Sequence, residues 1–168
     1  MNQCVMVPVT DDKTVAIVAA LAHQIWPEHY TPLIGKAQVA YMLQEFQSTV
    51  AIQRQINEGY LYFLARNPQN QDIGYCSIAH RLDELFLSKL YLSSEYRRTG
   101  NGRILMEFVK TLARDRNLPR ITLTVHKRNP TVAVYQKWGF TILEPIVTDI
   151  GQGYVMDDYR MGLEITSI

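Results

Sequence analysis

The segment best suited to chemistry is the short loop Gly100-Asn101-Gly102, which follows an apolar run ending at Leu92 and precedes a helix-like run. Glycine lets backbone N–H groups approach a ligand because no Cβ stands in the way. The free N–H groups and the dipole at a helix start both favour an anion such as phosphate. Arg97, Arg98 and Arg103 add positive charge to this loop. The sequence therefore predicts a phosphate-binding loop.

Other loops that bind anions fit these residues less well. The dinucleotide fingerprint needs a third glycine where this chain has Leu105, and an acidic residue near Val125 that is missing. A nucleoside-triphosphate loop needs Gly-Lys-Ser/Thr, which is also missing. A plain turn surrounded by solvated arginines is the alternative that these residues alone leave open.

A second segment that could do chemistry lies further along the chain, from Asn129-Pro130 through Tyr135 to Gly139-Phe140. Together the two segments resemble the signatures of the GNAT superfamily of N-acetyltransferases. Arg97-x-x-Gly100-x-Gly102 is similar to its Arg/Gln-x-x-Gly-x-Gly/Ala motif, and the later segment to its Asn-Pro-x-x-x-x-Tyr-x-x-x-Gly-Phe motif. The resemblance covers roughly residues 85–140, and the N-terminal third matches no motif.

The resemblance implies that acetyl-CoA is the cosubstrate and that it lies between two splayed parallel strands. Its pantetheine arm would bond to the strand edge at Leu90, Tyr91 and Leu92, and its pyrophosphate would rest on the amides of the glycine loop. The coenzyme-binding residues implied in this way are Leu90, Tyr91, Leu92, Arg97, Arg98, Thr99, Gly100, Asn101, Gly102, Arg103, Asn129 and Tyr135.

The resemblance also implies a reaction, the transfer of acetyl to a primary amine of a small molecule or peptide by direct attack in a ternary complex. A backbone amide at Leu92 would polarise the thioester carbonyl, and Tyr135 would protonate the departing sulfur as general acid. An amphipathic core tyrosine is the structural alternative for Tyr135. A catalytically inactive acetyl-CoA-binding sensor or regulatory module is the alternative function.

The general base is less defined by the sequence. An alkyl ammonium group has a pKa near ~10.4, so it must lose a proton before the nitrogen can attack. Several members of the superfamily have a glutamate where this chain has Thr124. His126 or Glu84 could act through water, and so could a chain of waters without a dedicated base.

For the acceptor amine, we expect Trp26, Glu28, His29 and Tyr30 to line the substrate cleft from a loop between the first two helices. Loop packing is the alternative for these residues. The carboxylates of Glu28, Asp157 and Asp158 would favour a cationic amine such as a polyamine. Peptide N-termini, amino acids and drug amines remain open.

Apolar periodicity predicts an α/β fold with a mixed sheet. The resemblance implies the GNAT fold, in which about four helices flank a mixed, mostly antiparallel sheet of six to seven strands with splayed parallel strands in the middle. Thr10 to Asp12 offer N-caps for the first helix, and Pro27 is expected to end it. A second helix is predicted through Val39 to Val50. The other predicted helices lie within residues 104–113 and 132–138, and the predicted strands are 5–9, 60–65, 73–78, 85–92, 121–125, 141–147 and 155–163.

Composition bounds the remaining properties of the chain. Its 168 residues suit one domain, residues 1–168. Lys and Arg total 17 against 16 Asp and Glu, so neither nucleic acid nor an anionic membrane is an expected partner. The two cysteines and four histidines show no metal-ligand spacing, so no metal is expected. We expect a cytoplasmic protein, and a homodimer because exposed final strands often pair in the superfamily.

Overall fold

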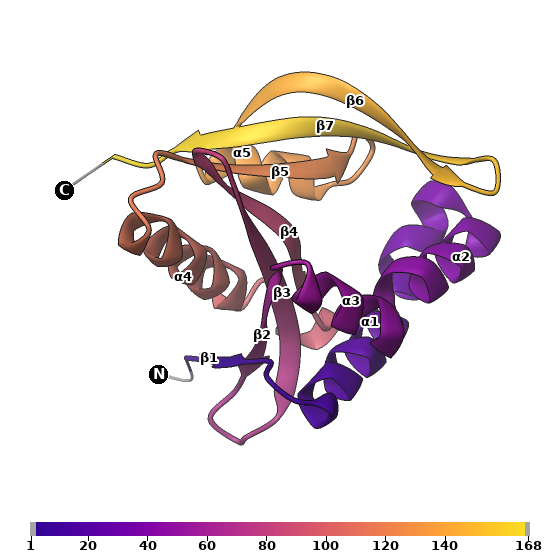
Figure 1. The fold of residues 1–168 in the computed structure, drawn as a ribbon, viewed down its shortest axis with the longest axis horizontal. Coiled ribbons are helices and arrows are strands. Elements are labelled where there is room, and N and C mark those ends of the chain that lie inside the picture. The colour runs from indigo at the N-terminus through magenta and orange to yellow at the C-terminus, as the bar shows by residue number, and fades with distance from the viewer. Residues whose placement is uncertain (1–2, 167–168) are drawn as a thin grey trace.

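A single seven-stranded sheet organises residues 3–166, the part of the chain that the computed structural model describes (Figure 1). The strands run in the order β1-β2-β3-β4-β5-β7-β6. Every neighbouring pair is antiparallel except β4 and β5. The strands are β1 (Val5–Pro8), β2 (Leu61–Arg66), β3 (Asp72–Arg81), β4 (Glu84–Leu92), β5 (Arg120–His126), β6 (Thr141–Gly151) and β7 (Tyr154–Glu164).

The parallel strands β4 and β5 separate soon after they begin. Their residues pair at only three positions, from Glu84 opposite Arg120 to Phe86 opposite Thr122. A register shift in the β3–β4 ladder follows at Ser88, an extra residue that bends β4. The remaining parts of β4 and β5 diverge and leave a gap in the middle of the sheet.

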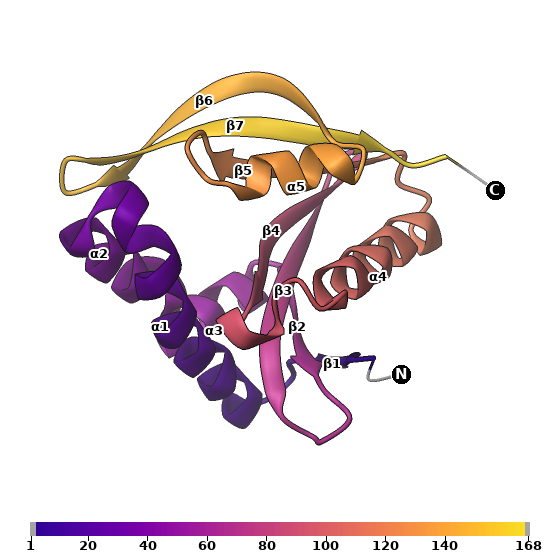
Figure 2. The same cartoon turned by 180° about the vertical axis from the view of Figure 1, so that it is seen from behind.

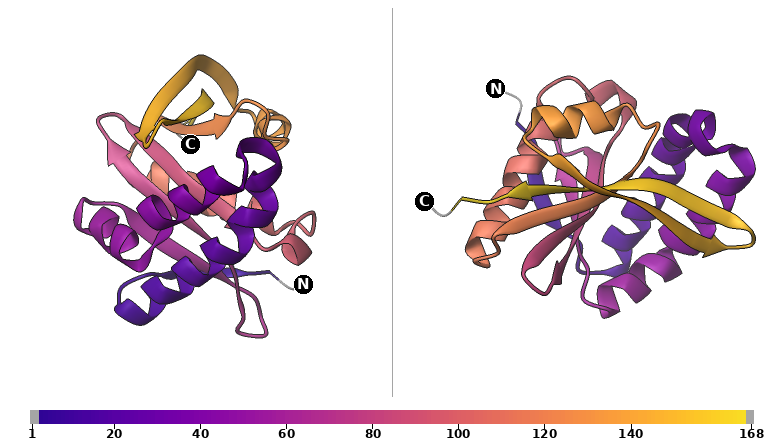
Figure 3. Two further views of the ribbon diagram at one scale, coloured as in Figure 1. Left: turned by 90° about the vertical axis from the view of Figure 1, so that its right-hand side faces the viewer. Right: turned by 90° about the horizontal axis from the view of Figure 1, so that it is seen from above.

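Five helices cover the two faces of the sheet in the described part of the chain (Figures 1 and 2). Three lie on one face and two on the other, and the two views of Figure 3 show how the first three gather beside the β6–β7 hairpin. The helices are α1 (Asp12–Ile34), α2 (Lys36–Gln47), α3 (Thr49–Asn57), α4 (Asn101–Asp115) and α5 (Thr131–Lys137).

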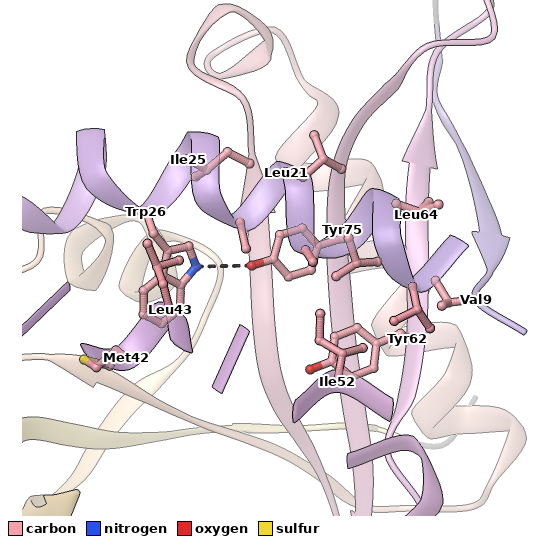
Figure 4. Close-up of a cluster of buried hydrophobic side chains, with 14 of the residues drawn as sticks. Val9, Leu21, Ile25, Trp26, Met42, Leu43, Ile52, Tyr62, Leu64 and Tyr75 are labelled. Atoms are coloured by element: carbon pink, nitrogen blue, oxygen red, sulfur yellow. Dashed lines mark hydrogen bonds between the residues drawn. The ribbon is translucent and has the colours of Figure 1, made fainter. Parts of the chain in front are cut away.

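A core of aliphatic and aromatic side chains joins α1, α2 and α3 to β2 and β3 (Figure 4). Tyr62 and Tyr75 are almost completely buried in it. The indole N–H of Trp26 donates a hydrogen bond to the Tyr75 hydroxyl at 3.1 Å, which satisfies both polar groups inside the core. The gap between β4 and β5 therefore has one wall fixed by the N-terminal helices.

The first helix is longer than the sequence predicted, because Pro27 does not end it. Helix α1 passes through both Pro27 and Pro32 and stops at Gly35. Both prolines are on the exposed side, where water can bond the carbonyl groups that they leave without an N–H partner. Buried Trp26 and Tyr30, one turn apart, hold this part of the helix on the sheet. The predicted loop between the first two helices is wrong.

The second predicted helix is in fact two helices. It breaks at Ser48, whose hydroxyl accepts a hydrogen bond from the Ala51 N–H and caps α3. Within residues 3–166, five helices thus replace the four or so that were expected, while the seven strands and the parallel pair in the middle confirm the predicted fold class. None of the helices in residues 3–166 is long and apolar enough to span a membrane.

The β6–β7 hairpin reaches over to the N-terminal helices at its tip. The Tyr41 hydroxyl on α2 donates to the Ile150 carbonyl at 2.6 Å, and its ring packs on Tyr154. The Gln38 side-chain amide donates to the Val155 carbonyl at 2.9 Å. These contacts join α2, in the N-terminal part of the chain, to the tip of the C-terminal hairpin β6–β7.

Candidate active site

The gap between β4 and β5 opens into two connected spaces. The first, here called the inner cavity, has a volume of about 150 Å³ and is bordered by Leu87–Leu92, Leu123–Val125 and Tyr135. The second, here called the outer cleft, extends toward α2 and α3 and includes His126 and Asp158. The residues that line both spaces are Tyr30, Ser88, Lys89, Tyr91, Thr124 and Val125. The two spaces therefore adjoin along the gap.

The open edge of β4 presents backbone groups to the inner cavity. The Ser93 N–H donates to the Ile73 carbonyl on β3 at 2.9 Å. Because alternate residues of an antiparallel strand face opposite edges, the backbone groups of Leu92 and Leu90 face the gap, while those of Tyr91 face β3. The Arg97 side chain donates a hydrogen bond from Nε to the Leu92 carbonyl at 2.9 Å, which agrees with a Leu92 backbone that faces away from β3. The Leu92 N–H is left as a donor directed into the gap.

The glycine loop leads directly into α4, as the sequence predicted. Gly100 has a φ of 90°, a left-handed conformation that favours glycine, and it is the N-cap of the helix. Gly102 is under no such constraint, because a Cβ there would lie 3.4 Å from the Trp138 ring, an ordinary van der Waals contact. Asn101 is buried, and its amide donates to the Thr99 hydroxyl at 2.9 Å. The loop therefore has a fixed shape, whereas the Arg98 and Arg103 side chains are exposed.

Tyr135 extends from α5 to the inner cavity. Its ring packs edge-on against Trp138 and Phe140, with centroid distances of 5.8 and 5.5 Å. Burial raises the pKa of Tyr135 far above its ordinary value, and Tyr30 raises it further. A phenol with this pKa keeps its proton at neutral pH, so it is present as a donor that can hydrogen-bond to a leaving sulfur and pass its proton as negative charge develops there. Asn129, at the start of the same segment, is buried and also borders the cavity.

The four residues expected to bind the acceptor lie on α1 instead of in a loop. Tyr30 borders both spaces, and its hydroxyl lies 2.8 Å from that of Tyr91. His29 borders the inner cavity, where its pKa is lowered by burial first and by the nearby Arg97 second. Trp26 borders the outer cleft but is 4% exposed and bonded to Tyr75. Glu28 borders neither space and lies 3.9 Å from Arg97.

Of the two side chains considered as general base, His126 borders the outer cleft and Glu84 does not border either space. The Glu84 carboxylate accepts hydrogen bonds from Arg160 and Thr122, each at 2.8 Å. His126 Nδ1 accepts the Arg128 N–H at 3.2 Å, which leaves the proton of the neutral ring on Nε2. Burial, followed by Arg128, lowers the pKa of His126. Both Glu84 oxygens and Nδ1 of His126 therefore already accept a hydrogen bond from the protein.

Two buried charged residues border the gap, and sequence reasoning missed one of them. Lys89 was not predicted as a site residue. It is 9% exposed, and its ammonium group donates to Gln55 at 2.8 Å and Ser88 at 3.3 Å. Burial lowers the pKa of Lys89 to about 7. Asp158 on β7, one of the carboxylates expected to favour a cationic amine, is 7% exposed and borders the outer cleft. A lysine inside an apolar strand was the sequence signal for Lys89.

Comparison with known proteins decides the family. Residues 30–157 match the family described as the acetyltransferase (GNAT) domain, well over half of the chain. The chain belongs to the GNAT acetyltransferase family. This assignment confirms the resemblance seen in the two motifs and the predicted enzyme class, an acyltransferase that depends on acetyl-CoA.

Solved GNAT structures share the fold at low sequence identity. PaiA N-acetyltransferase from Thermoplasma acidophilum, crystallised with coenzyme A, is 18% identical, with a TM-score of 0.76 over 95% of this chain and 99% of that one. A GCN5-related N-acetyltransferase from Rhodopseudomonas palustris is 16% identical, with a TM-score of 0.82 and coverages of 98% and 97%. The ribosomal-protein-S18-alanine N-acetyltransferase of Escherichia coli is 18% identical, with a TM-score of 0.72 and coverages of 100% and 96%. No curated protein sequence matches significantly.

Among residues 3–166, no three His, Cys, Asp or Glu side chains lie together in a way that could hold a metal ion. The polar groups of this GNAT site include backbone amides, hydroxyls, the separate histidines His29 and His126, and the buried charged side chains of Lys89 and Asp158. Such a set suits acyl transfer, in which a donor polarises a carbonyl and an acid protonates a leaving group.

Proposed function

We propose that this protein transfers the acetyl group of acetyl-CoA to a primary amine of a small molecule or peptide, by direct attack in a ternary complex. The observation that carries the proposal is that Tyr135 and the open edge of β4 at Leu92 border the same cavity. A proton donor and a carbonyl-polarising N–H are thereby brought to one place, between the coenzyme loop and the outer cleft.

The residues around the glycine loop fit coenzyme A. Left-handed Gly100 turns the chain so that the first N–H groups of α4 stay free of side-chain caps. These N–H groups would hold the pyrophosphate, and the Leu90 and Leu92 edge would hold the pantetheine amides. When bound, acetyl-CoA supplies the activated acetyl thioester. Tyr91 contributes by its side chain, because its backbone is directed toward β3.

Each catalytic role follows from the position of the group. The Leu92 N–H donates to the thioester carbonyl oxygen, where negative charge develops. Tyr135 gives its proton to the leaving sulfur. His29 and Tyr30 border the same cavity from α1 and orient the two substrates. The acceptor amine enters through the outer cleft.

Direct attack is favoured over an acyl-cysteine route. The chain has two cysteines, Cys4 and Cys76, and both are buried outside the lining of either space. Burial raises the pKa of Cys76 to about 12, so its thiol stays protonated and poorly nucleophilic. The amine itself is then the nucleophile.

The experiment measures coenzyme A release with a thiol reagent while acetyl-CoA is offered to polyamines, amino acids, peptides and aminoglycosides. The variant Tyr135→Phe keeps the ring contacts and removes the proton, so kcat should fall about 100-fold or more with acetyl-CoA affinity unchanged. Tyr154→Phe, at the hairpin tip away from both spaces, is the matched control and should keep wild-type kcat.

Two results would contradict the proposal. Full activity of Tyr135→Phe would remove this residue as the acid. Tight acetyl-CoA binding without release of coenzyme A in the presence of any amine would favour the sensor alternative.

We also propose a homodimer that pairs through the last strands. Strand β6 is a free edge of the sheet in the described part of the chain, so its outer backbone groups have no strand partner. Ile142, Leu143 and Val147 on this strand are 41%, 40% and 64% exposed. An exposed, apolar edge strand is a surface that a second copy can cover.

A further inference from the structure

The outer cleft contains a buried carboxylate that no other group in residues 3–166 satisfies. Across residues 3–166, three buried side-chain atoms lack a hydrogen-bond partner, and Oδ1 of Asp158 is the only one of them that belongs to a charged group. Leaving a buried polar atom without a hydrogen-bond partner costs about 1–3 kcal/mol of stability, and more when the group is charged. Such an atom indicates a ligand that is brought to it.

The position of Asp158 connects it to the reacting groups. Asp158 lies opposite His126 on β5 and opposite Ile146 on β6, in the middle of the three C-terminal strands. Burial raises the pKa of Tyr30 to about 12, with a smaller contribution from Asp158, and Tyr30 in turn adds to the raised pKa of Tyr135. Tyr30 borders the outer cleft together with Asp158 and the inner cavity together with Tyr135.

The lining around Asp158 suits the carbon chain and the charge of an alkyl ammonium ion. Trp26, Phe46 and Tyr91 supply aromatic surface, and Met42 and Met156 supply flexible apolar surface. Aromatic faces attract cations, and a desolvated carboxylate attracts them more strongly. The titratable and charged groups that border the cleft or act on Asp158 are Tyr30, Arg54, Glu58, Tyr60, Lys89, Tyr91, His126, Lys127 and Asp157.

Resting on the proposed acetyl transfer, we infer that Asp158 binds the ammonium group of the acceptor and takes its proton, so that the acceptors of this enzyme are primary amines that arrive charged. The carboxylate accepts one proton and leaves a neutral amine in the gap. The nitrogen then forms its bond to the acetyl carbon as the carbon–sulfur bond breaks. The sulfur takes the Tyr135 proton, and the proton that the nitrogen sheds restores Tyr135.

The protonation state of Asp158 agrees with this role. Burial, helped by Asp157 and opposed by Lys127, raises its pKa to about 6. At pH 7 it is mostly ionised and ready to accept a proton, and it is a stronger base than an ordinary aspartate. Lys89 borders the same cleft, but its nitrogen is already bonded to Gln55 and Ser88.

The test compares Asp158→Asn with Asp115→Asn, using the amine that wild type acetylates fastest. Asp115 is an exposed aspartate at the end of α4, and it borders neither of the two spaces. We expect Asp158→Asn to lower kcat/KM about 100-fold at pH 7 with unchanged acetyl-CoA affinity, and Asp115→Asn to stay near wild type.

The pH profile distinguishes proton removal from a structural role. Wild-type kcat/KM should be flat from above pH 6 up to the pKa of the amine, because the ammonium form is the one that binds. In Asp158→Asn only the neutral amine reacts, so kcat/KM should rise about tenfold per pH unit from pH 7 to 9 as that form becomes more abundant. Asp158→Glu should restore at least a tenth of the lost activity.

The inference is overturned if Asp158→Asn keeps wild-type activity, or if its deficit is the same at every pH. It is also overturned if neither Asp158→Asn nor Asp158→Glu binds acetyl-CoA, because the carboxyl would then be structural. Wild type that acetylates no amine at all would overturn the proposed function itself, and this result is distinct from turnover that is indifferent to Asp158.

Discussion

Replacing the buried Lys89 by methionine should change how the stability of the protein depends on pH. Burial lowers the pKa of Lys89 to about 7, whereas the unfolded chain has the ordinary value of 10.5. Between these pH values the unfolded state binds a proton that the folded state has lost. The free energy of unfolding therefore rises with pH in this window, and the gain is lost as the pH falls through 7.

The size of this change in the free energy of unfolding follows from the one proton that Lys89 takes up on unfolding. The slope approaches about 1.4 kcal/mol per pH unit once Lys89 is neutral in the folded state, which amounts to about 2 kcal/mol between pH 7 and pH 9. Methionine has nearly the same length and no charge, so Lys89→Met should lack this rise and should gain stability most clearly below pH 7. The lost hydrogen bond to Gln55 offsets about 1 kcal/mol of that gain.

Urea unfolding at a series of pH values from 6 to 9 measures the effect. Other groups also contribute in this range, among them Cys76, whose pKa is about 12 in the folded protein and 9.0 in the unfolded chain. The quantity of interest is therefore the difference between wild type and Lys89→Met. The exposed Lys137 on α5 provides the control, because Lys137→Met should follow the wild-type curve. Parallel curves for wild type and Lys89→Met would refute the reasoning, since Lys89 would then keep an ordinary pKa.

Two further predictions concern the glycine loop and the sheet edge. Gly100→Ala places a Cβ on a residue with a φ of 90°, so unfolding should become easier by about 1 kcal/mol in thermal denaturation and acetyl-CoA should bind more weakly by calorimetry, whereas Gly102→Ala should keep wild-type thermal stability. Val147→Lys on the β6 edge should convert the proposed dimer to a 19.3 kDa monomer in gel filtration with light scattering, and a wild-type monomer would contradict the dimer.

The coenzyme half of the site could be predicted from sequence because its chemistry depends on backbone shape. Gly100 and the Asn129–Phe140 segment are constrained at fixed spacings, and the structure brings Leu92 and Tyr135 to one cavity as those spacings implied. The acceptor half depends on side chains from distant elements. No local pattern indicates that Asp158 on β7 meets Lys89 on β4 and Tyr30 on α1 around one cleft.

The predicted helix end at Pro27 was wrong for a similar reason, because tertiary packing decides where this helix ends. A proline rule describes the backbone alone, whereas the apolar period of Ile25, Trp26 and Tyr30 describes what the helix packs against. Tertiary burial outweighed the missing hydrogen bonds because both prolines face solvent. The continued period through Pro27 was the signal that favoured one long helix.

The contacts between α2 and the tip of the β6–β7 hairpin bear on how acceptor preference could be exchanged between relatives. Tyr41 and Gln38 donate hydrogen bonds to the backbone carbonyls of Ile150 and Val155. The two walls of the outer cleft therefore come from segments that are far apart in the sequence. A recombinant that imports only the N-terminal helices would meet a hairpin shaped for other side chains. Acceptor preference should therefore be inherited only when both ends are exchanged together around an unchanged middle, residues 84–140.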